Sequence, residues 1–251
     1  MGNTENKMWF FLQTCLTVVG HSVELTVSVF ICYFMAIKLY NYIAIGLLLY
    51  VSSLFADGIG ISDKLLNYVA ERYSQSAKLR LIGWQNLIKS HNNKNEKEKL
   101  ALVNSFINQI RFVDDITHWG KQDYWATPIE LLATNGGDCE DFSIAKYFTL
   151  REMGVPDERM RITYVKSLKL NQAHMVLTYY PSPDSDPLVL DNLINDVKPA
   201  SKRNDLLPIY SFNAQDLWLA KERGRGRLVG SSDRISMWLD LLGRIEKEKI
   251  Q

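Results

Sequence analysis

Apolar residues recur at helical spacing in the part of the chain that follows residue 60. Two stretches, 61–74 and 98–112, repeat apolar side chains in the way typical of amphipathic helices that pack on a core. A short helix is predicted to begin at Thr127–Glu130, which combines a capping box with proline at the first helical position. Another helix is predicted over 139–153, because Gly154–Pro156 supplies a stop signal.

The hydrophobic period changes to two beyond residue 156. Alternating patterns predict strands over 161–166, 175–180 and 188–191, and the connection between the last two has the length of a hairpin loop. The order of these elements predicts an α+β fold, with a helical N-terminal half packed on an antiparallel sheet. A terminal helix that packs on the domain is predicted from apolar residues at helical spacing: Ile235, Trp238, Leu239, Leu242 and Ile245.

The first 56 residues have the features of an export leader. A basic start at Met35–Lys38 is followed by an apolar core at Tyr42–Val51 and by the small residues of Ser52–Ala56, which is the order of a secretory signal peptide. Cleavage is expected after Ala56. The sequence therefore predicts a leader over 1–56 and an exported mature domain over 57–251.

Residues 8–34 are also apolar, but His21 and Glu24 interrupt them. Two explanations fit this stretch. It is an artefact of an upstream start site, with Met35 as the true start, or it is part of a membrane hairpin. Met35 alone begins a complete signal, which favours the first explanation, and no stable membrane span is expected in the mature form.

Charge and cysteine content narrow the function classes. The chain has 29 basic and 28 acidic residues and a net charge of +1, without a basic block that would indicate nucleic-acid binding. Of the three cysteines, Cys15 and Cys32 lie in the leader. Removal of the leader would leave Cys139 as the only thiol, so no disulfide framework is expected and this thiol would stay reduced.

The segment Gly136–Phe142 places Cys139 at a predicted helix start, directly after two glycines. His174 opens one predicted strand and Asp191 ends another, so the chain order is that of a thiol triad. A hairpin would bring His174 and Asp191 toward each other, although the sequence does not fix the register. The alternative for Cys139 is a buried structural thiol.

The expected roles follow from ordinary thiol chemistry. A helix N-terminus and an imidazolium each favour the thiolate form of Cys139. His174 would act as base and then as acid, and Asp191 would hold its imidazole in the useful tautomer. The backbone N–H of Cys139 would be the first donor to an oxyanion.

Three carboxylates, Asp138, Glu140 and Asp141, surround the cysteine in the sequence and should disfavour its thiolate. One explanation is local: Asp138 caps the helix, and the other two complement the helix dipole. The other explanation is a bound hard cation, with Ca²⁺ as the expected ion, that neutralises the cluster. Charge spacing alone leaves both open.

The two blocks Asp123–Pro128 and Gly137–Phe142, followed by His174 and Asp191, resemble the bacterial transglutaminase-like cysteine proteinases, and in particular the LapG type. The resemblance covers roughly residues 60–220. It implies a papain-like, transglutaminase-like core in which Cys139, His174 and Asp191 are the nucleophile, base and orienting residue. It also implies a requirement for Ca²⁺, which favours Asp138, Glu140 and Asp141 as metal ligands.

The same resemblance implies a periplasmic endopeptidase that cleaves the N-terminal region of a large surface adhesin and so promotes biofilm dispersal. An inner-membrane receptor for cyclic di-GMP is the implied inhibitor. Trp125, within the first block, is expected to line the site or contact the receptor, and the alternative is a core tryptophan. Two other functions remain in view: acyl transfer to an amine by the same triad, and a non-catalytic binding module with this fold.

Overall fold

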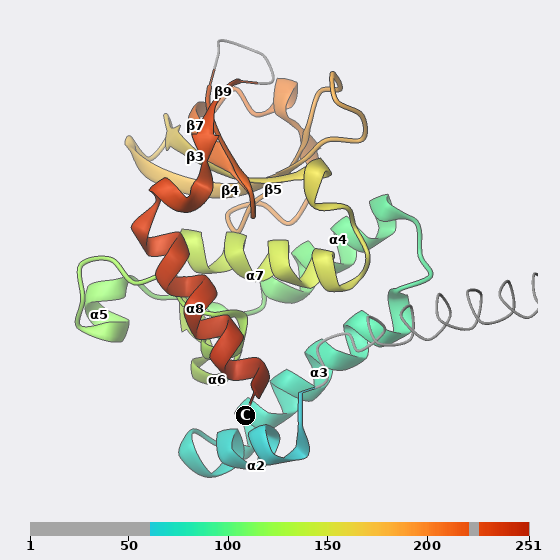
Figure 1. The fold of residues 1–251 in the computed structure, drawn as a ribbon, viewed down its shortest axis with the longest axis vertical. Coiled ribbons are helices and arrows are strands. Elements are labelled where there is room, and N and C mark those ends of the chain that lie inside the picture. The colour runs from blue at the N-terminus through green and yellow to red at the C-terminus, as the bar shows by residue number, and fades with distance from the viewer. Residues whose placement is uncertain (1–60, 221–225, 251) are drawn as a thin grey trace, which may run out of the picture. The chain divides into compact units, whose positions relative to one another are not determined.

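The computed structural model describes residues 61–220 and 226–250, and Figure 1 shows their arrangement. The predicted leader, its cleavage after Ala56 and the start at Met35 lie outside the described residues, as does the proposed boundary between leader and domain. Among the described residues, no helix combines the length and apolar character needed to cross a membrane.

Within the described part of the chain, five helices precede Cys139: α2 (Asp63–Arg72), α3 (Gln75–His91), α4 (Glu96–Ile107), α5 (Asp115–Trp119) and α6 (Pro128–Thr134). Each begins where a side chain accepts a hydrogen bond from the first turn. The capping box predicted at Thr127 is confirmed: its hydroxyl accepts from the Glu130 N–H, and the Glu130 carboxylate accepts from the Thr127 N–H.

The predicted helix over 98–112 ends earlier than expected, at Ile107. Arg111–Phe112 is instead a short strand, β1, which pairs in parallel with β2 (Gly136–Gly137). Asn108 caps the end of the helix, and its side-chain amide donates to the backbone carbonyl of Asp191 at 2.9 Å. Apolar spacing did not reveal this contact, because the partner lies 83 residues away along the chain.

Helix α7 (Cys139–Glu152) is the centre of the molecule, and ten consecutive residues from Asp141 to Leu150 are buried. It lies between the other helices and one face of a sheet (Figure 1). A helix buried on all sides needs no amphipathic pattern, which explains why its apolar residues do not form a single stripe. Its N-terminus carries the cysteine predicted to be the nucleophile.

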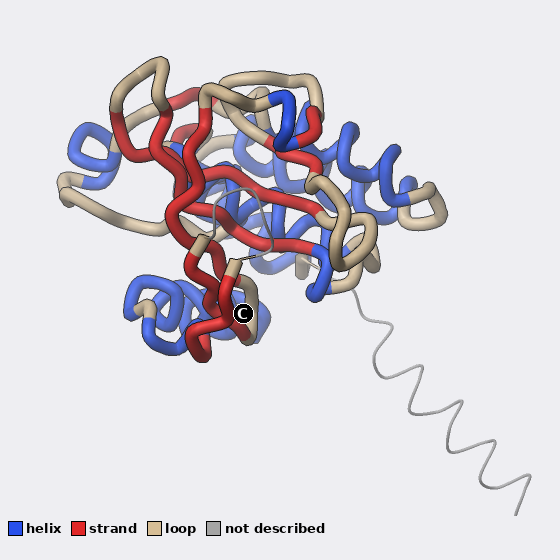
Figure 2. Tube along the Cα trace, turned by 90° about the horizontal axis from the view of Figure 1, so that it is seen from above, coloured by secondary structure: helices blue, strands red, loops and turns tan. Residues whose placement is uncertain are grey.

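Among the described residues, the larger sheet has seven strands in the order β6-β5-β4-β3-β7-β8-β9, and every neighbouring pair is antiparallel. Figure 2 shows the strands in red, seen from above with helices beneath them. The three predicted strands are confirmed as β3, β4 and β5, and the other four were not predicted. Their bounds are β3 (Met160–Ser167), β4 (Gln172–Tyr179), β5 (Leu188–Leu190), β6 (Lys198–Pro199), β7 (Leu206–Phe212), β8 (Asp216–Leu219) and β9 (Arg227–Ser231). Three 3₁₀ turns complete the described elements: Asp157–Arg159, Ala200–Lys202 and Ser232–Arg234.

The terminal helix α8 (Ser236–Ile250) packs on the domain through Trp238, which is fully buried and stacks on Phe148. The predicted face was wrong at one position. Leu239 is 46% exposed, whereas Leu241 is fully buried. Leu241 lies three positions after Trp238 and so shares its buried face, whereas Leu239, the next residue, points to another side of the helix.

Candidate active site

The two glycines before Cys139 are needed because other side chains approach them closely. A Cβ at Gly137 would lie 2.5 Å from the Asp141 carboxylate and 2.6 Å from a methyl group of Leu131. At Gly136 it would lie 2.9 Å from the imidazole of His118. Gly137 also accepts a hydrogen bond from Val113, so the glycine pair fixes the path of the chain into α7.

Replacing Gly137 with alanine is therefore expected to lower the free energy of unfolding by about 1–3 kcal/mol, the usual cost of overpacking a core. Urea denaturation of the purified protein measures this change. Gly243→Ala is the matched control, because a Cβ there meets nothing within 4 Å and alanine favours the helix. A Gly137→Ala variant as stable as Gly243→Ala would contradict the prediction.

Asp141 ties the start of α7 to the segment that precedes α6. Its buried carboxylate accepts hydrogen bonds from the N–H groups of Ala126, at 2.6 Å, and Asp138, at 3.3 Å. Burial raises its pKa well above the ordinary value, with Glu140 and Asp115 adding to the effect. Asp141 therefore has a structural role at the helix start, in addition to its place among the carboxylates.

The thiol of Cys139 is partly buried and lies 3.0 Å from a carboxylate oxygen of Glu140, to which it donates. The backbone N–H of Met175 donates to the sulfur and brings strand β4 against the helix start. Burial raises the pKa of this thiol far above its usual range, and the neighbouring charges of Glu140 and Asp138 raise it further. A thiolate here needs compensating positive charge.

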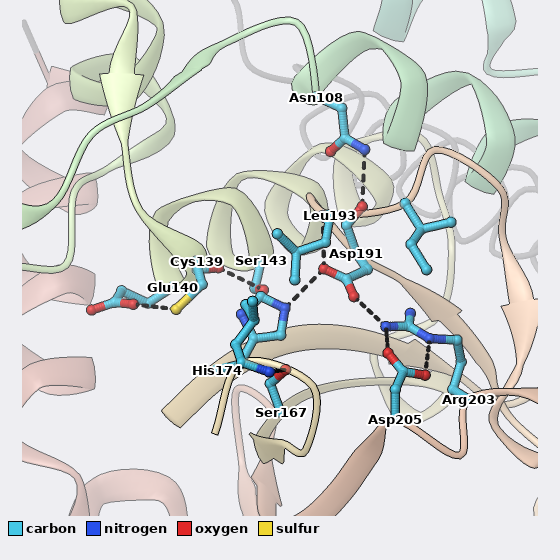
Figure 3. A network of polar contacts seen from close by, with 12 residues as sticks. Asn108, Cys139, Glu140, Ser143, Ser167, His174, Asp191, Leu193, Arg203 and Asp205 are labelled. Carbon is cyan, nitrogen blue, oxygen red and sulfur yellow. Dashed lines mark hydrogen bonds and ion pairs between the residues drawn. The ribbon is translucent and has the colours of Figure 1, made fainter. Parts of the chain in front are cut away.

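The predicted hairpin brings His174 and Asp191 side by side, and the register that the sequence left open is the one that allows their contact. The Nε2 atom of His174 is 2.8 Å from Oδ1 of Asp191, and both side chains are buried. The strand register explains the contact. Leu177 pairs with Leu190, so Asp191 falls opposite Val176. Because side chains alternate between the two faces of a strand, Asp191 lies on the face that Val176 shares with His174. In Figure 3 the imidazole stands between the Cys139 thiol and the Asp191 carboxylate, with its second ring nitrogen toward the sulfur.

Asp191 is held by four groups from different parts of the chain. Besides His174, the N–H of Leu193 donates to Oδ1 and the guanidinium of Arg203 donates to Oδ2, while Asn108 donates to the backbone carbonyl. Burial alone would raise the pKa of this carboxyl. The hydrogen bond and charge of His174, together with the Leu193 and Arg203 contacts, outweigh burial and lower the pKa to about 2.

The structure adds two carboxylates, Asp115 and Asp123, to the three predicted ones. Asp115 lies with Asp138 and Asp141, and Asp123 lies with Asp115 and Glu140; the oxygen atoms of each group are within 4.8 Å of one another. In the sequence, Asp123 was singled out only as the first residue of the block Asp123–Pro128. No signal in the sequence pointed to Asp115, which begins helix α5.

Two oxygens of this cluster are buried without a hydrogen-bond partner among the described residues: Oδ1 of Asp138 and Oδ1 of Asp115. Burial, with the charge of Glu140, raises the pKa of Asp138 to about 10. Burial likewise raises the pKa of Asp115 to about 6. Five carboxylates, two of which have an unsatisfied buried oxygen, form a donor set suited to a hard cation.

Trp125 lies in the core. It is 5% exposed and stacks on Phe212 with ring centres 5.7 Å apart, and its side chain hydrogen-bonds Asp123. The guanidinium of Arg244 on α8 donates to the Trp125 carbonyl. Trp125 thus has the position expected of a core tryptophan beside the carboxylates, and its contact with substrate or receptor stays a prediction.

Comparison with known proteins assigns the family. Residues 72–222 match the bacterial transglutaminase-like cysteine proteinases. The structure is similar to that of EGTA-treated Legionella pneumophila LapG, with 47% sequence identity, a TM-score of 0.65, and coverage of 73% of this chain and 97% of that one. Calcium-bound LapG from the same organism is 46% identical, with a TM-score of 0.64 and coverage of 74% and 99%.

No match was found among curated proteins. The matched region contains Cys139, His174 and Asp191. The helices and the seven-stranded antiparallel sheet of the described residues confirm the predicted fold class. The chain therefore belongs to the bacterial transglutaminase-like cysteine proteinases and has a LapG-like fold.

Proposed function

We propose that Cys139, His174 and Asp191 form the catalytic triad of a cysteine endopeptidase. The observation that carries this proposal is the buried 2.8 Å contact between His174 and Asp191. His174 lies on strand β4, and the next residue of that strand, Met175, contacts the Cys139 sulfur through its backbone N–H. Family membership supports proteolysis as the reaction. Cys139 is the first residue of α7, so its backbone N–H has no acceptor within the helix.

In this mechanism the Cys139 sulfur attacks the scissile carbonyl carbon, and the free ring nitrogen of His174 takes up the thiol proton. The Cys139 N–H donates to the oxyanion that forms. His174 then gives its proton to the leaving amine, and an acyl thioester remains. A water molecule, deprotonated by His174, hydrolyses the thioester and restores the thiol. Asp191 holds the Nε2–H tautomer throughout.

We infer that Ca²⁺ binds the carboxylate cluster. Asp138, Glu140 and Asp141 would hold it, with Asp115 and Asp123 completing the donor set. The fit rests on the unsatisfied buried oxygens of Asp138 and Asp115 and on the all-carboxylate donors. The solved structures of a calcium-bound and an EGTA-treated Legionella LapG support calcium over other hard cations. When bound, the ion supplies the positive charge that offsets these carboxylates beside the thiol.

We further propose that the enzyme works in the periplasm on the N-terminal region of a large surface adhesin, and that an inner-membrane cyclic di-GMP receptor inhibits it. The similarity to LapG and the signal-like sequence over 1–56 support this assignment. Cleavage would release the adhesin and promote biofilm dispersal.

A cleavage assay tests the proposal. The purified protein is incubated with a recombinant adhesin N-terminal fragment, in excess Ca²⁺ or in EGTA, and the products are sequenced at their new N-termini. Cleavage is expected only with Ca²⁺, and Cys139→Ala should abolish it. Glu140→Gln should need more Ca²⁺ for half-maximal cleavage, whereas the exposed Glu158→Gln should behave as the wild type.

Cleavage by Cys139→Ala, or cleavage unaffected by EGTA, would contradict the proposed enzyme. A labelled primary amine is included in a parallel reaction, because the same thioester would pass to an amine in an acyl transferase. Incorporation of the amine without peptide cleavage would favour the transferase. A thiol no more reactive than free cysteine would favour the binding module.

A further inference from the structure

Arg203 is a buried cation directly behind the proposed catalytic pair. It follows the 3₁₀ turn Ala200–Lys202, and its side chain is 3% exposed. Its Nη2 donates to Oδ2 of Asp191 at 2.7 Å and to Oδ2 of Asp205 at 2.8 Å, while its Nε donates to Oδ1 of Asp205 at 2.9 Å. The guanidinium therefore donates two hydrogen bonds to Asp205 and a third to Asp191 (Figure 3).

The two-bond contact with Asp205 fixes the plane of the guanidinium. A planar fork bound to a carboxylate in this way has little freedom to rotate, so the direction of the bond to Asp191 is fixed as well. Asp205 is one-third exposed at its side chain, whereas the Asp191 side chain is fully buried. The network thus runs from the protein surface to the buried carboxylate.

The Asp191 carboxylate is divided between two sets of donors. Oδ1 receives His174 and the Leu193 N–H, and Oδ2 receives Arg203. Rotation of the carboxylate would exchange these oxygens and break bonds on both sides. A buried carboxylate that keeps its charge also needs a charged or strongly polar partner, because burial favours the neutral acid.

We propose that Arg203 is a positioning residue of this active site: its guanidinium, anchored by Asp205, keeps Asp191 ionised and oriented so that His174 presents its free ring nitrogen to Cys139. Arg203 touches neither the thiol nor the peptide bond and acts through Asp191. The inference rests on the proposed triad and extends it by two residues. In this arrangement the loss of Arg203 slows the chemical step and leaves substrate binding in place.

The test compares Arg203→Met, Arg203→Lys and Asp205→Asn in the full protein at saturating Ca²⁺. Arg159→Met is the matched control, because Arg159 pairs with Glu96 at the surface, away from Asp191. Three quantities are measured: kcat and KM for cleavage of the adhesin fragment, the rate of Cys139 alkylation by iodoacetamide, and the midpoint of urea unfolding. Alkylation needs no protein substrate, so it reports on the thiol and imidazole alone.

Arg203→Met is expected to lower kcat and the alkylation rate by about 10- to 100-fold, the range that a buried charge-assisted hydrogen bond supports, with KM changed less than about twofold. Arg203→Lys should recover part of the loss, because it keeps the charge and loses the fork. Asp205→Asn should lower kcat by about 3- to 10-fold, since Arg203 stays in place without its charged anchor. Arg159→Met should match the wild type.

Wild-type kcat and alkylation in folded Arg203→Met would overturn the inference. If that variant does not fold, Asp205→Asn decides, and an unchanged kcat in it overturns the inference. Two other results would contradict the triad itself. One is that Cys139 of the wild type is alkylated no faster than free cysteine; the other is that His174→Ala does not slow the alkylation of Cys139. The two failures are therefore distinguishable.

Discussion

Replacing Asp191 with asparagine is expected to lower kcat by about 10³- to 10⁴-fold, the loss that follows when a triad histidine is held in the wrong tautomer. All the groups that face the Asp191 side chain are donors: His174, the Leu193 N–H and Arg203. An asparagine has one acceptor and one donor end, so it cannot satisfy both sides.

The asparagine oxygen will face Arg203, because a guanidinium cannot accept a hydrogen bond. Its amide NH₂ then faces His174 Nε2, which must become an acceptor. The imidazole proton moves to the other nitrogen, the one directed toward Cys139 in Figure 3, and the base is lost.

Steady-state cleavage of the adhesin fragment measures this effect, and urea unfolding shows that the variant is folded. Asp196→Asn is the matched control, since this aspartate lies in the same region of the chain with its side chain 80% exposed. A kcat for Asp191→Asn within tenfold of the control would contradict the assigned role of Asp191.

Lys146→Met is expected to increase the free energy of unfolding by about 3–5 kcal/mol at pH 6, and by less as the pH rises. Lys146 is on helix α7 and is 1% exposed. Burial lowers its pKa from 10.5 to about 7, and the nearby charge of Asp191 opposes this shift only in part. Below pH 7 the folded protein therefore carries a charged amine in its core.

The pH dependence follows from proton binding in the two states. Between about pH 7 and pH 10.5 the unfolded chain keeps the Lys146 proton that the folded protein has released, so the contribution of Lys146 to wild-type stability rises with pH in this window. The difference between Lys146→Met and the wild type should be largest below pH 7 and should decrease above it.

Urea unfolding at pH 6, 7.5 and 9 measures this difference. Lys99→Met is the matched control: Lys99 is also buried, but its amine donates to the Met153 carbonyl at 2.6 Å, so its loss should destabilise the protein. The control retains Lys146 and its pH dependence. A difference for Lys146→Met that is the same at all three pH values would contradict the assignment.

Local features of the sequence were sufficient to predict much of the catalytic half. The capping box at Thr127, the glycine pair before Cys139 and the stop after Glu152 act over a few residues, so they determine helix ends wherever the chain folds. The hairpin of β4 and β5 was predictable for the same reason. The sequence left the strand register open, and the observed pairing of Leu177 with Leu190 is what places Asp191 next to His174.

Other parts of the site depended on contacts between distant segments. Asn108 directly follows α4 and Arg203 directly follows a 3₁₀ turn, and both reach Asp191; Asp115 reaches the carboxylates from α5. No periodicity or spacing marks these residues, because their partners are chosen by the paths of loops and by strand register.

The sequence by itself therefore determined the helix that carries the proposed nucleophile, the order of the proposed triad residues and the class of the fold. Only the tertiary structure decided which donors orient Asp191 and which carboxylates join Asp138 and Glu140. The physical reason is the distance along the chain over which each interaction acts. Capping and hydrophobic period act between neighbours in sequence, whereas orientation and charge compensation at a buried site require groups that packing brings together.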